Sequence, residues 1–597
     1  MSYFVGYNRF IGGLENKSSR GSIQRTYLDG YMMSDEGNTM EYKFYGWETA
    51  DIKDNNGLTP RDYYEILSKV WCTYTCAPRM RKDWSTDNKT LGQCSITAFL
   101  MQDIYGGKVY GVPLSDGNFH CFNDVGGCVF DLTSEQFGDT KLDYGNCPEQ
   151  FREVHFAKEE KRQRYEYLRY KTLLTQKAGK YLSDETIARS IVNGGDTERL
   201  ARLFERAGKG ERLTIAFLGG SITQGCLSSI PETCYAYLVY EWFVNTFPKS
   251  EFVYVNAGIG GTTSQFGAAR LEDDVLAYRP DFCMVEFSVN DSDNVFFKET
   301  YESVVSRLLE SETQPAVMIL HNLFYETGRN AQKQHLAVGT AYSIPCVSVR
   351  DAIFPEIKAG KISIPQLSSD GLHPNDDGHA VLAELVTTRL ESILRESEKA
   401  QKAGTEALSD GSRPGEDRGA EGSVHKPRIT PDSYCTIKRF QNKDAGIMCR
   451  GFSPDNTPKE NMLDIFKCGW KAAKTGDEIE FSFTGTELGI QYRKTIRRPA
   501  PVAEAIIDGD EEHPVILDAN FTEDWGDSLH IDTLLYHGHR VDPATMYGDF
   551  ETLRIDTGSD GIERRCMPAA KHTIKIRIIE THEDDREVFY LVSFIAG

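Results

Sequence analysis

A serine, an aspartate and a histidine in this sequence have types and spacing suited to nucleophilic catalysis. Ser221 lies in the turn Gly219-Gly-Ser-Ile-Thr, directly after an apolar run, and Asp370 and His373 lie in the downstream segment Asp-Gly-Leu-His-Pro. A serine hydroxyl is a poor nucleophile at neutral pH unless a base takes its proton during attack. We predict that His373 is this base and that Asp370 holds its imidazole in the correct tautomer.

Two further turns between these segments could supply hydrogen-bond donors. Gly261 ends the stretch Asn-Ala-Gly-Ile-Gly-Gly, Asn290 lies in Ser-Val-Asn-Asp, and each stretch follows an apolar, strand-like run. The predicted oxyanion donors are the N–H groups of Ser221 and Gly261 and the side-chain amide of Asn290. Taken singly, each motif also fits an ordinary turn or helix cap. Their order, each after a strand, favours a catalytic site.

These four segments resemble the blocks of the SGNH (GDSL-like) hydrolase family, over residues 206–395. The resemblance implies a flavodoxin-like α/β/α domain with Ser221 as the nucleophile of an esterase. It also implies short acyl groups, acetyl above all, on a carbohydrate or other small-molecule ester substrate. Two departures are visible, because Gly220 stands where the family commonly has Asp, and Ser288 stands where a Gly often begins the third block.

Apolar runs must position these turns if the four segments are to meet. Between 206 and 395 such runs alternate with amphipathic helical stretches, which predicts a parallel sheet in a three-layer α/β/α sandwich. The predicted strands cover residues 213–218, 252–256, 282–288, 316–320 and 346–349, and helices are predicted over 264–277 and 301–309. Ligands bind at the carboxyl ends of strands in such sheets, where these turns fall.

Changes in composition divide the rest of the chain, which is predicted to be multidomain. Residues 1–155 mix a helix near 61–71 with short strands and are predicted to form an α+β domain. A charged helical connector is predicted over 156–205. Residues 396–428 are polar and almost free of large apolar side chains, which predicts a flexible linker. Residues 429–597 alternate strand-length runs with turns, as expected of an all-β sandwich.

The N-terminal domain contains a second group of reactive residues. Cys94 begins a predicted helix, whose dipole lowers a thiol pKa, and His120 and Asp131 follow on neighbouring predicted strands. Cys, then His, then Asp is the chain order of papain-like and transglutaminase-like thiol enzymes, and Gln93 could offer an oxyanion amide. The stretch 58–170 resembles the YunG-like family, which implies no settled activity. A structural domain with a buried Cys94 is the competing interpretation.

The composition disfavours several other classes of function. The chain has 67 Lys and Arg against 89 Asp and Glu, and this net charge of −22 argues against a nucleic-acid partner or an anionic membrane surface. No run is apolar enough for a membrane span and no signal peptide is apparent, so a cytoplasmic protein is expected. The 14 cysteines form no CxxC pair, which favours reduced thiols, and no metal or cofactor is predicted.

Three alternatives to an esterase stay open at this point. The same triad could transfer an acyl group to a second sugar, a thiol hydrolase could act at Cys94, or the chain could bind glycans without catalysis. Aromatic residues of the C-terminal domain could form a sugar-stacking face, although such residues more often lie in a core or an interface. The residues concerned are Trp470, Tyr492, Trp525 and Tyr536.

Overall fold

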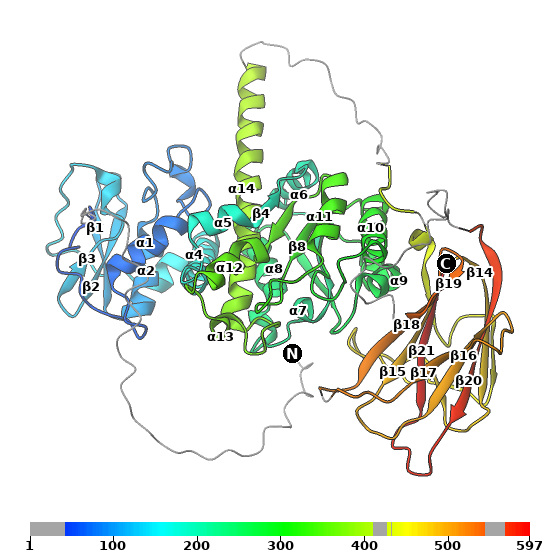
Figure 1. Cartoon of the computed structure of the whole chain (residues 1–597). Coiled ribbons are helices and arrows are strands. Elements are labelled where there is room, and N and C mark those ends of the chain that lie inside the picture. The colour runs from blue at the N-terminus through cyan, green and yellow to red at the C-terminus, as the bar shows by residue number, and fades with distance from the viewer. Residues whose placement is uncertain (1–41, 410–426, 432, 524, 544–566) are drawn as a thin grey trace, which may run out of the picture. The chain divides into compact units, whose positions relative to one another are not determined.

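The computed structural model describes residues 42–409, 427–431, 433–523, 525–543 and 567–597 (Figure 1). Within these ranges the predicted fold class is confirmed: an α+β domain, a central α/β/α domain and an antiparallel β domain follow one another along the chain. No helix of the described ranges combines the length and apolarity that crossing a bilayer requires.

The central domain contains a six-stranded sheet in the order β4-β9-β8-β7-β5-β6. Five of its strands are parallel, as predicted from the alternation of apolar runs with helices. They are β5 (Leu213–Gly219), β6 (Phe252–Gly258), β7 (Phe282–Glu286), β8 (Ala316–His321) and β9 (Cys346–Ser348). Because β5 lies between β6 and β7, the loops that follow these three strands meet at one edge of the sheet.

Helices cover both faces of this sheet. Along β5, Ile215 and Phe217 are buried in one apolar core, and Ala216 and Leu218 are buried in the other. A strand that buries both faces is apolar at nearly every position, which explains why these runs do not alternate with polar residues. The first core contains α6 (Glu198–Gly208), α8 (Tyr235–Thr246), α12 (Val349–Lys358) and α14 (Asp376–Ser409); the second contains α9 (Ser264–Asp274), α10 (Val295–Glu310) and α11 (Gln332–Ala341).

The predicted connector over 156–205 is helical for most of its length but also contributes a strand. Helices α4 (Glu159–Ala178) and α5 (Asp184–Ser190) are followed by β4 (Ile191–Asn193), which pairs antiparallel with β9. The predicted parallel sheet therefore carries one short antiparallel strand at this edge. A strand this short has no periodicity of its own, and it forms because the edge of β9 offers unpaired backbone groups.

The predicted linker over 396–428 was wrong in its first part, because α14 continues to Ser409. This segment has few apolar residues to bury, but it is rich in Ala, Glu, Lys and Gln, which are strong helix formers. Extending an existing helix adds one hydrogen bond for each residue fixed, without the cost of nucleation. Residues 410–426 of the predicted linker lie outside the described residues.

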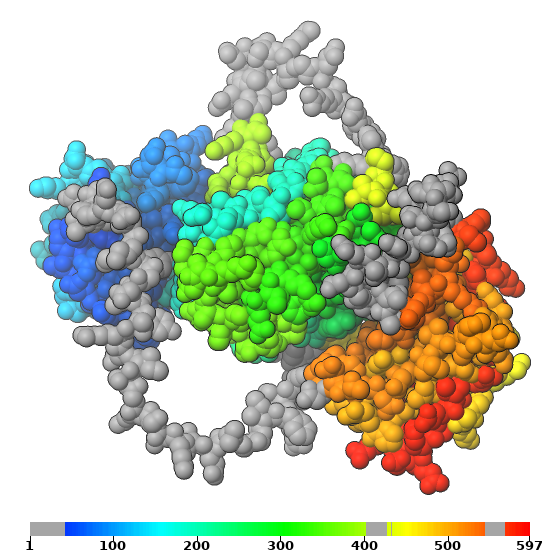
Figure 2. Space-filling model, viewed as in Figure 1, coloured from blue at the N-terminus to red at the C-terminus, as the bar shows by residue number. Residues whose placement is uncertain are grey.

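The N-terminal domain packs helices against a small antiparallel sheet, and Figure 2 shows its blue and cyan atoms closely packed. Its elements are α1 (Pro60–Val70), α2 (Cys94–Tyr105), β1 (Lys108–Pro113), β2 (Phe119–Val125), β3 (Cys128–Phe130) and α3 (Arg152–Phe156). Helix α4 packs against α1 and α2, so this domain extends past the predicted boundary at residue 155. Residues 1–41 of the predicted domain lie outside the described residues.

Helix α4 also packs against α8 and α14 of the central domain. Lys171 of α4 is buried there, with its Nζ atom 3.0 Å from Glu384 Oε2 and 3.1 Å from Glu391 Oε1. Burial alone would lower the pKa of Lys171, but the two carboxylates outweigh it and raise that pKa. The ammonium group therefore stays charged inside the contact between the helices.

The C-terminal domain consists of two antiparallel sheets that share one apolar core, as predicted. One sheet contains β10 (Lys438–Phe440), β12 (Ser453–Pro454), β13 (Trp470–Ala472), β15 (Leu488–Lys494), β18 (Ser528–Tyr536), β19 (His539–Arg540) and β21 (Phe589–Ala596). The other contains β11 (Ile447–Arg450), β14 (Glu478–Gly485), β16 (Val502–Ile507), β17 (Val515–Asp518) and β20 (Ala570–Glu580).

The aromatic face considered from the sequence does not form in this domain. Trp470, Tyr492 and Tyr536 are buried, and Trp525 alone of the four is exposed, at 63%. Trp470 and Tyr492 lie in the apolar core that the two sheets share, and Tyr536 lies in the apolar core that also contains α9 and α10, which are the more common uses of such side chains.

Candidate active site

Ser221 is the first residue of the short helix α7 (Ser221–Gln224), directly after β5. Gly220 precedes it at the N-cap position, and within the described residues no side chain caps this helix. The serine is 6% exposed and lies where the loops after β5, β6 and β7 meet. A hydroxyl held at a tight strand-to-helix turn is well placed to meet a substrate at the sheet edge.

The structure brings the three predicted triad residues together in one hydrogen-bonded chain. His373 Nε2 lies 2.8 Å from Ser221 Oγ, and His373 Nδ1 lies 2.6 Å from Asp370 Oδ2. Asp370 and His373 lie in the loop before α14. The His373 side chain is 22% exposed. This geometry allows the imidazole to accept the serine proton at one nitrogen while the carboxylate holds the other.

Asp370 is further fixed by its own loop. Its Oδ1 atom accepts the N–H groups of Leu372 at 2.9 Å and His373 at 2.8 Å, and the Ser368 hydroxyl at 3.1 Å. Partial burial by itself would raise the pKa of Asp370, but the hydrogen bonds from His373 and Leu372 outweigh it and lower the pKa to about 2. The carboxylate is therefore ionised across the range in which an imidazolium would need it.

Gly261 lies exposed in the turn after β6, with φ at +68°, a left-handed conformation that favours glycine. The neighbouring Gly260 donates its N–H to Gln224 Oε1 at 2.6 Å, which ties this turn to the end of α7. Gln224 was not singled out from the sequence, because its role depends on a turn far along the chain. The predicted oxyanion glycine thus lies on the loop beside the Ser221 loop.

Asn290 follows β7, and its side-chain amide packs against Gly220. A Cβ atom on Gly220 would lie 2.2 Å from Asn290 Oδ1, far inside van der Waals contact. In the present arrangement the amide occupies the space that a side chain at position 220 would need. The predicted oxyanion asparagine is thereby held next to the residue that precedes Ser221.

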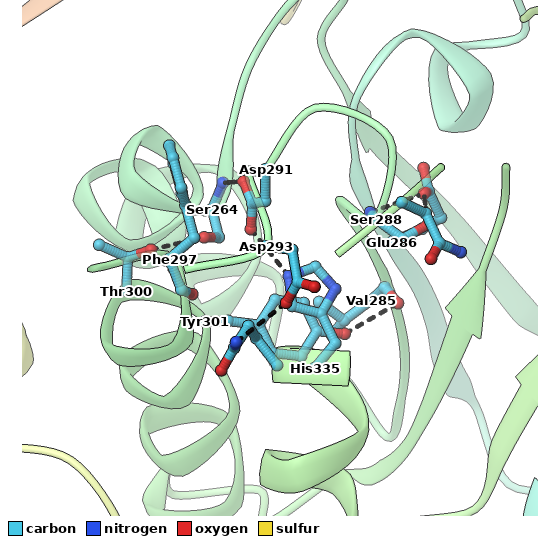
Figure 3. Close-up of polar contacts among 12 residues, drawn as sticks. Ser264, Val285, Glu286, Ser288, Asp291, Asp293, Phe297, Thr300, Tyr301 and His335 are labelled. Atoms are coloured by element: carbon cyan, nitrogen blue, oxygen red, sulfur yellow. Dashed lines mark hydrogen bonds and ion pairs between the residues drawn. The ribbon is translucent and has the colours of Figure 1, made fainter. Parts of the chain in front are cut away.

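A polar network behind Asn290 was missed by the sequence analysis. Asp291 lies between Ser264, at the start of α9, and His335 on α11 (Figure 3). Its Oδ1 atom accepts the Ser264 N–H at 2.8 Å, and its Oδ2 atom lies 2.9 Å from His335 Nε2. The Tyr301 ring stacks on His335 with centroids 3.7 Å apart. The network therefore ties the Asn290 loop to two helices.

Burial controls the charge of this network. It raises the pKa of Asp291 to about 8 and lowers that of His335 to about 3, because neither side chain is exposed to water. Asp291 directly follows Asn290, so the sequence already places it near the predicted site. Its partner on α11 is 44 positions away and belongs to no recognisable motif.

His379 and Ser288 lie near the triad, but their hydrogen bonds hold the surrounding structure in place. His379 is buried in α14, where Tyr235 donates its N–H to Nδ1 at 3.3 Å and Nε2 lies 3.2 Å from the Cys226 carbonyl oxygen. It is a helix-face residue rather than a second base. Ser288 donates its hydroxyl to Glu286 Oε1 at 2.9 Å within the third block.

The structure also brings Cys94, His120 and Asp131 of the N-terminal domain together. His120 Nε2 lies 2.6 Å from Asp131 Oδ2, and the Cys94 thiol interacts with His120. Gln93 does not lie as expected of an oxyanion donor, because its side chain is buried and its Nε2 atom donates to the Cys72 carbonyl at 3.2 Å. This Cys72 carbonyl, just beyond α1, also accepts the Cys76 N–H and the Thr75 hydroxyl.

Comparisons with known proteins agree with this geometry. Residues 217–381 match the GDSL-like lipase/acylhydrolase family and residues 59–176 match the YunG protein family. The chain is 31% identical over 208 residues to an acetylxylan esterase from Geobacillus stearothermophilus, covering 30% of this chain and 93% of the relative. It is 30% identical over 104 residues to the uncharacterized protein YunG from Bacillus subtilis (strain 168), covering 17% of this chain and 83% of the relative.

A solved structure extends the similarity beyond the central domain. A two-domain esterase (CEX) active on acetylated mannans is 43% identical, with a TM-score of 0.59, and the match covers 69% of this chain and 98% of that one. A second structure of a two-domain esterase (CEX) active on acetylated mannans, co-crystallized with mannopentaose, is also 43% identical, with a TM-score of 0.58. This match covers 69% of this chain and 97% of the chain in that structure. The chain therefore belongs to the GDSL-like lipase/acylhydrolase family, as a carboxylic ester hydrolase that also carries a YunG-family domain.

Proposed function

We propose that this protein removes acetyl groups from mannan-type oligosaccharides through an acetyl-Ser221 intermediate. Ser221 Oγ attacks the acetyl carbonyl carbon while His373 Nε2 takes its proton. The tetrahedral intermediate then collapses as His373 returns that proton to the leaving sugar oxygen. A water molecule, deprotonated by His373, then attacks the acetyl-serine; the bond to Ser221 Oγ breaks as His373 returns the proton to that oxygen, and acetic acid is released. Asp370 stabilises the imidazolium that forms in each half of the reaction.

The negative charge on the carbonyl oxygen requires donors that are in place before attack. We assign this role to the N–H groups of Ser221 and Gly261 and the side-chain amide of Asn290. Each such donor contributes on the order of 3 kcal/mol to transition-state stabilisation. Asp291 acts indirectly in this proposal, as a positioning residue for the Asn290 loop.

One observation carries the proposal: the hydrogen-bonded order Asp370, His373, Ser221 at an edge of the sheet. The choice of acyl group and sugar rests on relatives. The 43% identical esterase acts on acetylated mannans, and the match to it covers nearly all of that protein. The Geobacillus relative is an acetylxylan esterase, which makes acetylated xylan the competing substrate.

Acetate release from acetylated mannan and xylan oligosaccharides tests the proposal. We expect a higher kcat/KM on the mannan oligosaccharides and loss of nearly all activity in Ser221→Ala. The matched control is Ser250→Ala, which removes a serine hydroxyl bonded to the Ala207 carbonyl and should leave activity unchanged. Activity retained in Ser221→Ala would refute the mechanism. Transfer of acetyl to an added sugar alcohol in preference to water would instead identify an acyltransferase.

A further inference from the structure

The N-terminal domain holds a cysteine, a histidine and an aspartate in contact, outside the ester-hydrolysing domain. Cys94 is the first residue of α2, His120 lies on β2, and Asp131 directly follows β3. The His120 and Asp131 side chains are each 1% exposed, whereas Cys94 is only partly buried. Cys94 is thus the least buried residue of the three.

The Asp131 carboxylate has a complete set of donors. Its Oδ1 atom accepts the Thr133 N–H and the Thr133 hydroxyl, each at 3.0 Å, and its Oδ2 atom accepts the Tyr144 hydroxyl at 2.9 Å. His120 Nε2 completes the set at 2.6 Å. These four donors hold the carboxylate in place, and the carboxylate fixes the imidazole bonded to it. Because Nε2 faces Asp131, the second imidazole nitrogen is the one left for Cys94.

Packing restrains the imidazole in the same orientation. The Phe137 ring meets His120 edge-on, with centroids 4.7 Å apart. Burial alone would lower the pKa of His120, but the charges of Asp131 and Cys94 outweigh it and raise the pKa to about 10. An imidazolium in this position can give a proton to a leaving group that requires one.

The surroundings of Cys94 favour the thiolate. A hydrogen bond from the Cys121 thiol, together with the charge of His120 and a hydrogen bond with it, outweighs burial and lowers the pKa of Cys94 well below its ordinary value. In the described part of the chain, no side chain caps α2, so the N–H groups of its first turn, which Cys94 begins, also favour the thiolate. The same N–H groups are suited to stabilise an oxyanion.

We propose that Cys94, His120 and Asp131 form a second, thiol-dependent acyl-transfer site that acts on carboxylic amides or esters. The Cys94 thiolate attacks the carbonyl carbon and forms a C–S bond. The C–N or C–O bond then breaks as His120 gives its proton to the leaving amine or alcohol. Water attacks the thioester, transfers a proton to His120 and releases the carboxylic acid, which restores the thiolate and the imidazolium.

The nearby Cys121 raises the alternative of a redox pair. A thiolate beside a second thiol can form a disulfide when an oxidant accepts two electrons. That chemistry does not require an aspartate with four donors behind a histidine, whereas acyl transfer does, because the leaving group must be protonated. The arrangement of Asp131 and His120 therefore favours acyl transfer.

The test uses the full-length Ser221→Ala protein, in which the serine nucleophile is absent. It is treated with p-nitrophenyl acetate and with the acetyl amide of an aminocoumarin, and modified cysteines are located by peptide mass spectrometry. We expect Cys94 to be acetylated at least about 10-fold faster than Cys147, a partly buried cysteine of the same domain. Release of p-nitrophenol or aminocoumarin distinguishes an ester substrate from an amide.

Conservative variants keep the test informative if one of them unfolds. Cys94→Ser should abolish acetylation and turnover, His120→Gln should slow them by at least about 10-fold, and Cys147→Ser should change neither. Cys121→Ser retains a hydrogen-bond donor but cannot form a disulfide, so it should remain active. Absence of acetylation at Cys94 with both reagents would overturn the proposal. So would a peroxide-induced Cys94–Cys121 disulfide in a protein that turns over neither reagent.

Discussion

The contact between Gly220 and Asn290 leads to a quantitative prediction about the proposed oxyanion site. An alanine at 220 would place its Cβ atom 2.2 Å from Asn290 Oδ1 and 3.1 Å from Asn290 Cγ. Gly220 has φ at −90°, outside the left-handed region that favours glycine, so the amide is the nearest obstacle to the added methyl group. The amide must therefore move by about 1 Å, a displacement that can cost about 100-fold in rate.

A double-mutant cycle separates this mechanism from a general disturbance of the turn. Asn290→Ala should lower kcat by about 100- to 1000-fold, which is the cost of one oxyanion donor. Gly220→Ala should lower kcat by about 100-fold. If both act through the same amide, the double variant should be no slower than Asn290→Ala, which corresponds to a coupling energy of about 2.7 kcal/mol.

The assay is steady-state hydrolysis of p-nitrophenyl acetate, with the thermal unfolding midpoint as the control for folding. The labelling rate with a fluorophosphonate reports separately on whether Ser221 stays reactive. Multiplicative effects, with a loss of about 10⁴-fold or more in the double variant, would show that Gly220 acts independently of Asn290. An unimpaired Gly220→Ala enzyme would refute the reasoning outright.

Three other variants test the charged groups. Asp370→Asn should lower kcat on the order of 10³-fold with little change in KM, since the neutral amide cannot stabilise the His373 imidazolium, and an equal rise in KM would contradict this role. Burial raises the pKa of Glu286 to about 7, so its folded form holds a proton that its unfolded form loses above pH 4–5. This proton contributes on the order of 3 kcal/mol to the free energy of unfolding at low pH, and the contribution is lost as pH rises through 7. When the free energy of unfolding is measured in urea from pH 5 to 8, Glu286→Gln should therefore decline less with pH than the unmodified protein. Lys171→Met leaves Glu384 without its buried partner and should lower the free energy of unfolding by about 3–5 kcal/mol, whereas unchanged stability would mean that water reaches the carboxylates.

Much of the site could be predicted because its motifs are local. Ser221, Gly261 and Asn290 each occupy a turn directly after an apolar strand, and parallel strands carry their carboxyl ends to one edge. The spacing of Asp370 and His373 within one loop likewise allowed the pair to be recognised. Each of these motifs consists of a few adjacent residues, so it can be recognised in the sequence alone.

Features that depend on competition between elements could not be predicted in this way. The end of α14 at Ser409 was decided by helix propagation from a buried segment, and β4 was decided by the open edge of β9. Neither leaves a periodic pattern in its own residues. The predicted boundaries at 155 and 396 were wrong for this reason. Helix α4 packs on the N-terminal domain and α14 continues past residue 396, although the composition of the chain changes at both places.

Residue types and their order in the chain show which side chains could react, but the fold sets which of them come together. Cys94, His120 and Asp131 appear in order along the chain, but only the packing of β2 against α2 and the pairing of β3 with β2 bring the three together. The link between Asp291 and His335 likewise joins positions 44 residues apart. The physical reason is that residue type fixes a group's chemistry, whereas its proton affinity depends on burial and on neighbours that are distant in the chain.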